Sequence, residues 1–150
     1  MWLDKISQNL SQIPEFIEYF ENELIAHRND VKISGNLEKQ LSSLPGITET
    51  VFCKLQEIEA VLKYLNIQLE KTKSDYFKKY LENYNKVLSS RDCEKYVDGE
   101  SEVVDFQILI NQVALIRNKY LGICKGLESK NYMLGHIRNL RTAGMENISI

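Results

Sequence analysis

A run of lysines interleaved with aromatic residues is the part of this sequence whose residue types could do chemistry. The segment KTKSDYFKKY carries Lys71, Lys73, Lys78 and Lys79 around Tyr76. Lysines neutralise phosphates and aromatic faces stack on bases, and proteins that bind single strands of any sequence combine the two. The same spacing also suits an amphipathic helix with its aromatic rings in a core and its lysines in water. The residues alone leave both interpretations open.

A second basic stretch lies near the C-terminus. Residues 1–70 hold six Lys/Arg against eleven Asp/Glu, whereas residues 71–150 hold thirteen against ten. An acidic half joined to a basic half favours contact with a polyanion at one end of the protein. Between residues 117 and 141 Glu128 is the single acid among six basic residues. Three of these basic residues join the predicted DNA-binding set: Lys130, Arg138 and Arg141.

Patterns for catalysis or for a metal site are missing from the sequence. It contains no glycine-rich phosphate loop and no nucleophile elbow. Cys53, Cys93 and Cys124 are an odd number at wide spacings, which predicts reduced thiols, not a disulfide framework or a zinc site. His27 and His136 have no partner at ligand spacing. We therefore expect no catalytic residue, no metal and no cofactor, and a protein that acts by binding.

The elements that must position the basic residues are helices. Two prolines and seven glycines are too few for the turns of a sheet protein, which predicts an all-α fold. Pro14 favours a helix start and opens an acidic amphipathic stretch, which breaks at residues 34–36. Pro45 and Gly46 then form a stop signal. These features predict an N-terminal acidic helical arm over residues 1–46.

Two long helices are predicted after this arm. From residue 48 to residue 88 there is no glycine or proline, and apolar residues recur at spacings of four and three. Ser89 can cap a short helical connection that ends at Asp98 and Gly99, and Ser101 can cap a last long helix. Two long helices joined by a short connection predict a long antiparallel helical hairpin over residues 47–150, the core for oligomerisation and DNA binding.

The last helix carries an apolar seam at coiled-coil spacing. An isolated hairpin would leave apolar side chains uncovered, which points to self-association as a homo-oligomer. The seam residues that we expect at the oligomer interface are Leu109, Val113, Ile116, Tyr120, Ile123, Leu127, Leu134 and Ile137.

Three segments resemble the UvsY-type recombination mediators of phages: KTKSDYF at 71–77, KVLSSRDCEKYVDGE at 86–100 and SKNYMLGHIRNLRTAG at 129–144. The resemblance implies a ring-like homo-oligomer that binds single-stranded DNA. It also implies partners, a RecA-like recombinase and the single-strand-binding protein that this recombinase replaces in recombination, replication and repair. The family's DNA-contacting basic positions fall on Lys71 and Lys73. Residues 1–46 match no segment of the family, and Leu140 stands where many relatives carry a bulky aromatic.

Two other classes of function remain open. The chain could be a helical adaptor or assembly protein that does not bind DNA, whose seams bind partner helices and whose lysines only keep it in solution. It could also be a double-strand binder without preference for single strands.

No stretch has the eighteen apolar residues of a membrane span, and MWLDKISQNL lacks the apolar core of a signal peptide. We therefore expect a cytoplasmic protein without membrane contact, in the host cytoplasm if it is encoded by a phage.

Overall fold

The computed structural model of this 150-residue chain describes residues 1–83 and 88–144, and nearly all of them are helical. In chain order the elements are α1 (Trp2–Gln8), the short 3₁₀ helix η1 (Leu10–Gln12), α2 (Ile13–Val31), α3 (Leu37–Asn83), α4 (Ser90–Asp98) and α5 (Ser101–Thr142). The described residues contain no strand, so the expectation of an all-α protein is confirmed. Within them, no helix combines the length and the apolar character that a bilayer crossing requires.

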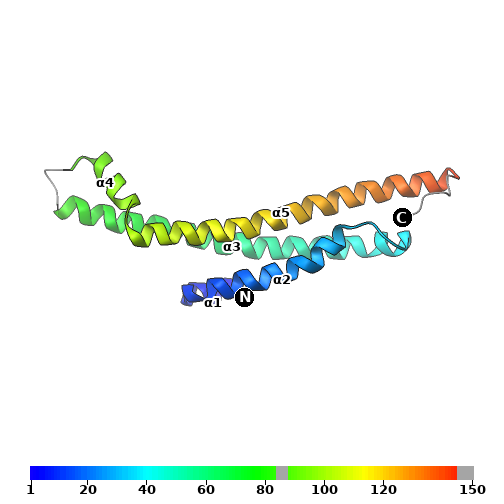
Figure 1. The fold of residues 1–150 in the computed structure, drawn as a ribbon, viewed down its shortest axis with the longest axis horizontal. Helices are drawn as coiled ribbons and strands as arrows, with labels where there is room; N and C mark the ends of the chain where they lie inside the picture. The colour runs from blue at the N-terminus through cyan, green and yellow to red at the C-terminus, as the bar shows by residue number, and fades with distance from the viewer. Residues whose placement is uncertain (84–87, 145–150) are drawn as a thin grey trace.

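The two long helices α3 and α5 lie side by side and run in opposite directions (Figure 1). α3 begins at Leu37 and continues through Pro45 without a break. A proline inside a helix costs about 3 kcal/mol, because it removes a hydrogen bond and crowds the preceding turn. Leu44 and Val51 on either side of it are 4 % and 0 % exposed, and burying each stabilises the fold by about 1.5–3 kcal/mol. The predicted stop at Pro45 and Gly46 was therefore wrong, because packing outweighs local propensity here.

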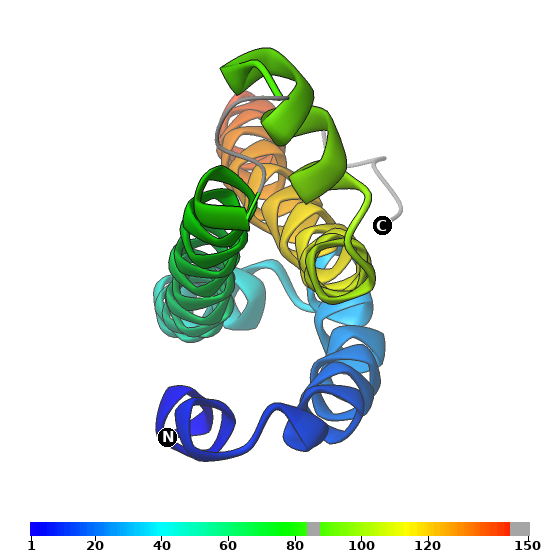
Figure 2. The same ribbon diagram turned by 90° about the vertical axis from the view of Figure 1, so that its left-hand side faces the viewer.

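The residues before α3 fold back along the long helices. α1 packs on α3 and α2 packs on α5, so the chain wraps beneath both (Figure 2). Phe16, Phe20 and Leu24 of α2 are buried and share one core with α3 and α5. Residue 46 also lies inside α3. The division into an arm of residues 1–46 and a core of residues 47–150 is therefore corrected: α1 and α2 are part of the core.

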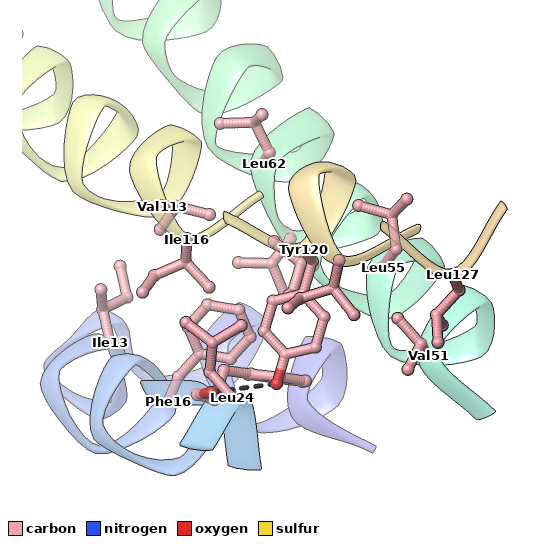
Figure 3. Packing of buried hydrophobic residues seen from close by; sticks show 14 of the residues in the cluster. Ile13, Phe16, Leu24, Val51, Leu55, Leu62, Val113, Ile116, Tyr120 and Leu127 are labelled. Atoms are coloured by element: carbon pink, nitrogen blue, oxygen red, sulfur yellow. Dashed lines mark hydrogen bonds between the residues drawn. The ribbon is translucent and has the colours of Figure 1, made fainter. Parts of the chain in front are cut away.

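The apolar seam of α5 lies inside this core (Figure 3). The ring of Tyr120 meets the ring of Phe20 edge-on, with 5.7 Å between centroids. Leu109 and Ile137 are partly buried. The other six residues predicted for an oligomer interface are buried within the single chain: Val113, Ile116, Tyr120, Ile123, Leu127 and Leu134. The interface prediction is corrected for these six, because α2 and α3 already cover the surface that a second subunit would need.

The short helix α4 lies at the end of the molecule away from the α2–α3 link (Figure 1). As predicted, Ser89 caps it: its hydroxyl accepts a 3.2 Å hydrogen bond from the backbone N–H of Asp92. Val97 of α4 packs with Leu69 and Val103 in a small second apolar cluster. α4 is thereby held against the end of α3 that carries the segment 71–79. Residues 86 and 87, which begin the second segment resembling the mediator family, lie outside the described residues.

Candidate nucleic-acid interface

The predicted DNA-binding segment 71–79 lies near the C-terminal end of α3, where α4 packs. Lys71, Lys78 and Lys79 are exposed. Lys73 is less accessible, and its Nζ lies 3.4 Å from a carboxylate oxygen of Asp98 on α4. One of the two positions that the family resemblance assigns to DNA is therefore already paired with an acid of the same chain.

Two tyrosines, Tyr76 within this segment and Tyr80 directly after it, are also engaged by acids. The hydroxyl of Tyr76 donates a 3.0 Å hydrogen bond to Glu102, which raises the pKa of Tyr76. The hydroxyl of Tyr80 donates to Glu100, and the ring of Tyr80 stacks on Tyr96 of α4 at a centroid distance of 5.9 Å. Intramolecular contacts thus account for aromatic groups that were candidates for stacking on bases.

The charge balance around this segment is negative once the chain has folded. Residues 70–83 and 88–105 form this end of the molecule, and they hold six Lys/Arg against nine Asp/Glu. α4 and the start of α5 contribute five of those acids, and Glu100 between them is a sixth. A phosphate backbone approaching the lysines of α3 therefore meets an excess of like charge. Sequence proximity suggested a basic site, whereas the tertiary arrangement surrounds it with carboxylates.

The second predicted set, on α5, divides into buried and exposed members. Lys130 is only 6 % exposed, and its Nζ donates a 2.5 Å hydrogen bond to the backbone carbonyl of Asp30 at the end of α2. Burial lowers the pKa of the Lys130 ammonium, and the nearby Asp30 charge opposes this effect. Lys130 is therefore a buried residue, and its prediction as a surface DNA contact is corrected. Arg138 and Arg141 are exposed.

We call residues 28–39 and 125–144 the basic end. Gly126 of α5 faces Val31 of α2 there, and α3 starts beside them (Figure 1). This end holds seven Lys/Arg against three Asp/Glu, and residues 129–144 contain no acid. Charges of opposite sign thus gather at two opposed ends of the fold, and the basic end is not the one that carries segment 71–79.

Two lysines of the basic end were missed from the sequence. Lys32 and Lys39 belong to the first 46 residues, which appeared acidic as a whole. Folding places both around a pocket of about 450 Å³ whose lining also includes Lys130. Lys130 donates to the backbone carbonyl of Asp30 on α2, which is one hundred residues away in sequence. The packing of α2 and α3 on α5 brings these charges together, so no local sequence signal could have identified them.

An exposed aromatic pair lies on the same part of α5. Tyr132 is 68 % exposed, and its ring meets the ring of His136 edge-on at 4.4 Å between centroids. A hollow of about 370 Å³ beside them is lined by Tyr132, His136 and Arg138 together with Leu41 of α3. An open ring beside an arginine is the combination that bases and phosphates of a single strand can use.

Comparison of the chain with family models, with characterised proteins and with solved structures found no match. The likeness to the mediator family therefore rests on the three short segments quoted above.

Proposed function

We propose that this chain binds single-stranded DNA through its basic end. The observation that carries the proposal is a set of four exposed basic residues at this end: Lys32 after α2, Lys39 on α3, and Arg138 and Arg141 on α5. The exposed Tyr132 lines one hollow together with Arg138. Each phosphate that such side chains neutralise releases condensed counterions, which is the main source of affinity in sequence-independent binding. Tyr132 would add stacking on a base, at about 1–3 kcal/mol.

Within this proposal the chain acts as a recombination mediator. The three segments that resemble UvsY-type mediators support it, and two of them, 71–77 and 129–144, carry exposed basic residues, among them Lys71, Arg138 and Arg141. A mediator must contact DNA and protein partners at the same time. The charge separation between the two ends suits that task, because the basic end can hold DNA while the acidic end around α4 remains open to a RecA-like recombinase. A loading assay on DNA coated with single-strand-binding protein tests this role directly.

Self-association is part of the same proposal. Since the seam of α5 is buried within the chain, we place the contact between copies on the opposite face of α5. Val104, Ile108 and Leu115 are 37 %, 50 % and 56 % exposed and share one helical face. A Leu115→Glu substitution should lower the mass measured by light scattering, whereas Leu140→Glu at the far end should leave it unchanged. A native protein that is monomeric at micromolar concentration would contradict this part.

A helical adaptor is the second candidate function. It is favoured by an apolar groove of about 500 Å³ between α3 and α5, lined by Leu41, Leu44, Phe52 and Cys124 among others. Phe52 is 54 % exposed there, a form of surface that can receive the apolar side of a partner helix. An adaptor would bind no nucleic acid at low salt, and this separates the two candidates.

The test of DNA binding compares two double variants that each remove two exposed positive charges. Arg138→Ala/Arg141→Ala changes the basic end, and Lys71→Ala/Lys78→Ala changes the end beside α4. We expect the arginine variant to bind fluorescent oligo-dT at least tenfold more weakly and to flatten the slope of log affinity against log salt by about 1.4, since each phosphate contact contributes about 0.7 on single strands. The lysine variant should stay near the native values.

The opposite ranking of these variants would move the DNA site to α3 and contradict the basic-end assignment. Absence of oligo-dT binding by the native protein at low salt would overturn the proposal and favour the adaptor. Equal affinity for duplex and single strands would show that single strands are not preferred.

A further inference from the structure

The pocket at the basic end lies where the link between α2 and α3 meets α5. We call it the elbow pocket, and its charged lining consists of Lys32, Lys39, Lys130 and Asp30. The lining of this space of about 450 Å³ therefore includes three lysines and one aspartate. The remaining lining is mostly small and polar, including Ser34, Asn36 and Ser43. The walls thus carry a net positive charge and several hydrogen-bonding groups.

Lys130 is the unusual member of this lining. Only 6 % of the residue is exposed, yet among the described residues no carboxylate oxygen lies within 4.0 Å of its Nζ. Within residues 1–83 and 88–144 its one hydrogen-bond acceptor is the Asp30 carbonyl, whereas an ammonium carries three N–H groups. A buried charge without an ion pair is costly to a fold, and burial is the main reason that the pKa of Lys130 is lowered. An anion in the pocket would offset that cost.

The carboxylate of Asp30 does not fill this role. Its Oδ2 accepts a 3.1 Å hydrogen bond from Nδ1 of His27 on the same helix. Nε2 of His27 lies 2.9 Å from Nζ of Lys54, and because an ammonium can only donate, this nitrogen must be the acceptor and Nδ1 must carry the proton. Asp30 is therefore held by His27, which leaves the Lys130 ammonium to the pocket.

Lys39 and Lys32 complete a basic lining that is accessible from outside. Both residues are exposed. Nζ of Lys32 donates to the side chain of Asn29 at 3.1 Å, a neutral partner that an anion can replace. No side-chain partner within the described residues holds the ammonium of Lys39, whose backbone N–H instead donates to Asn36. A ligand entering the elbow pocket would therefore meet two exposed lysines, Lys32 and Lys39, and one buried lysine, Lys130.

We propose that the elbow pocket binds a phosphate group, with Lys130 as its buried contact and Lys39 and Lys32 at its rim. The proposal rests on the function proposed above in one respect, because a backbone or terminal phosphate of bound DNA is one source of this group. Free phosphate carries the same chemistry and is the other source. Binding should raise the pKa of Lys130, so that uptake of the anion is accompanied by uptake of a proton near the upper end of the pH range.

The first experiment uses inorganic phosphate and the full chain. The midpoint of thermal unfolding is measured against phosphate concentration at constant ionic strength, with chloride as the reference anion, because a ligand that binds only the folded state raises this midpoint. The test variants are Lys130→Met, which keeps the apolar stem, and Lys39→Gln, which alters an exposed side chain that a folding defect does not confound. Lys63→Gln, at an exposed position of α3 outside the pocket, is the matched control.

We expect phosphate to raise the unfolding midpoint of the native protein and of Lys63→Gln, and the dissociation constant to increase at least tenfold in Lys130→Met and several-fold in Lys39→Gln. A native protein that responds equally to phosphate and chloride would overturn the proposal. Unchanged phosphate affinity in both Lys130→Met and Lys39→Gln would also overturn it.

The second experiment repeats the titrations with oligo-dT, with and without a 5′-phosphate. If Lys130→Met weakens the binding of both inorganic phosphate and unphosphorylated oligo-dT, the pocket takes a backbone phosphate. A loss of affinity confined to the 5′-phosphorylated strand identifies a terminal phosphate, and unchanged affinity for both strands identifies free phosphate. Each of these three outcomes supports phosphate binding by the pocket. Oligo-dT binding without any phosphate response overturns the pocket but leaves DNA binding at the basic end intact. Failure of both titrations overturns both proposals.

Discussion

The side-chain hydroxyl of Tyr120 on α5 donates a 2.9 Å hydrogen bond to the backbone carbonyl of Phe20 on α2, one hundred residues away in sequence (Figure 3). Both side chains are fully buried, and burial raises the pKa of the phenol well above its usual range, so it stays a donor at all physiological pH values. This bond joins the N-terminal helices to the long helical pair.

Removal of that hydroxyl should weaken the fold without changing its shape. Tyr120→Phe keeps the ring but leaves a buried carbonyl without this donor, so we expect the free energy of unfolding to fall by about 1–2 kcal/mol in urea titrations. Tyr132→Phe removes a hydroxyl that is exposed to water and should change the value by less than about 0.5 kcal/mol. Equal effects of the two substitutions would show that the Tyr120–Phe20 bond does not stabilise the protein.

The glycines of α5 provide a second, internally controlled prediction. A Cβ at Gly126 would lie 2.8 Å from Cγ1 of Val31 and 3.1 Å from its Cγ2, whereas a Cβ at Gly122 would meet no atom within 4 Å. Gly122→Ala should therefore stabilise α5 by about 1 kcal/mol through helix propensity alone. Gly126→Ala gains the same propensity but crowds α2, so it should be destabilising in net, by about 1–2 kcal/mol.

The clash also predicts a rescue. Combining Gly126→Ala with Val31→Ala removes the two crowded methyl groups and should restore part of the lost stability in thermal or urea unfolding. If Gly126→Ala stabilises the protein as much as Gly122→Ala does, then α2 does not approach α5 as closely as described.

Deletion of the N-terminal helices should damage the whole protein. Removing residues 1–33 would uncover Tyr120, Ile116 and the other α5 side chains that α2 covers. Substitutions that empty a core of one aromatic ring already cost about 3–5 kcal/mol, and this deletion removes two, Phe16 and Phe20. We expect a truncated chain that lacks a cooperative unfolding transition in circular dichroism. A truncated chain that keeps the native transition would restore the original interpretation of an independent arm.

Acid should weaken the ion pair between Glu23 of α2 and Lys54 of α3. The hydrogen bond and the charge of Lys54 on α3 lower the pKa of Glu23 below its ordinary value of 4.5. The stabilisation from this pair is therefore complete above pH 4.5 and is lost as the pH falls through the lower pKa of the folded state. The effect should stay below about 1 kcal/mol, because 41 % of the Glu23 side chain is exposed to solvent.

The measurement is the stability difference between the native protein and Glu23→Gln in urea, taken at pH 6 and near pH 3. The native protein should be the more stable at pH 6, and the difference should shrink as the pH is lowered toward 3. A difference that persists in acid would show that the carboxylate charge does not contribute. Glu18→Gln, at an exposed position on the same helix, serves as the control.

Several elements of the fold were determined by the sequence itself. Pro14 lies in the first turn of α2, Ser89 caps α4, and the break at residues 34–36 is the link between α2 and α3, where Gly35 adopts a φ of +80°. These signals act over a few residues, because capping, proline geometry and left-handed backbone are local preferences. The apolar spacing of 101–141 likewise marks the buried face of α5 from sequence alone.

What covers that face was decided by the tertiary structure. A stripe of apolar residues predicts that a helix face is buried but does not identify the element that covers it. The seam of Val113, Ile116 and Tyr120 is therefore equally compatible with a second subunit and with α2. Pro45 shows the same limit, since its effect on the helix depends on how much Leu44 and Val51 gain from packing.

The candidate site depends on the tertiary structure most of all. Charge is additive along the sequence, but its field depends on distance in space. Lys73 belongs to the most basic segment of the sequence, yet α4 brings Asp98 to it. Lys39 belongs to an acidic segment, yet it lines one pocket with Lys130 because α2 and α3 both pack on α5. Residue types determined that this chain carries groups able to hold phosphate, and only the packing of its helices decided which of them share one surface.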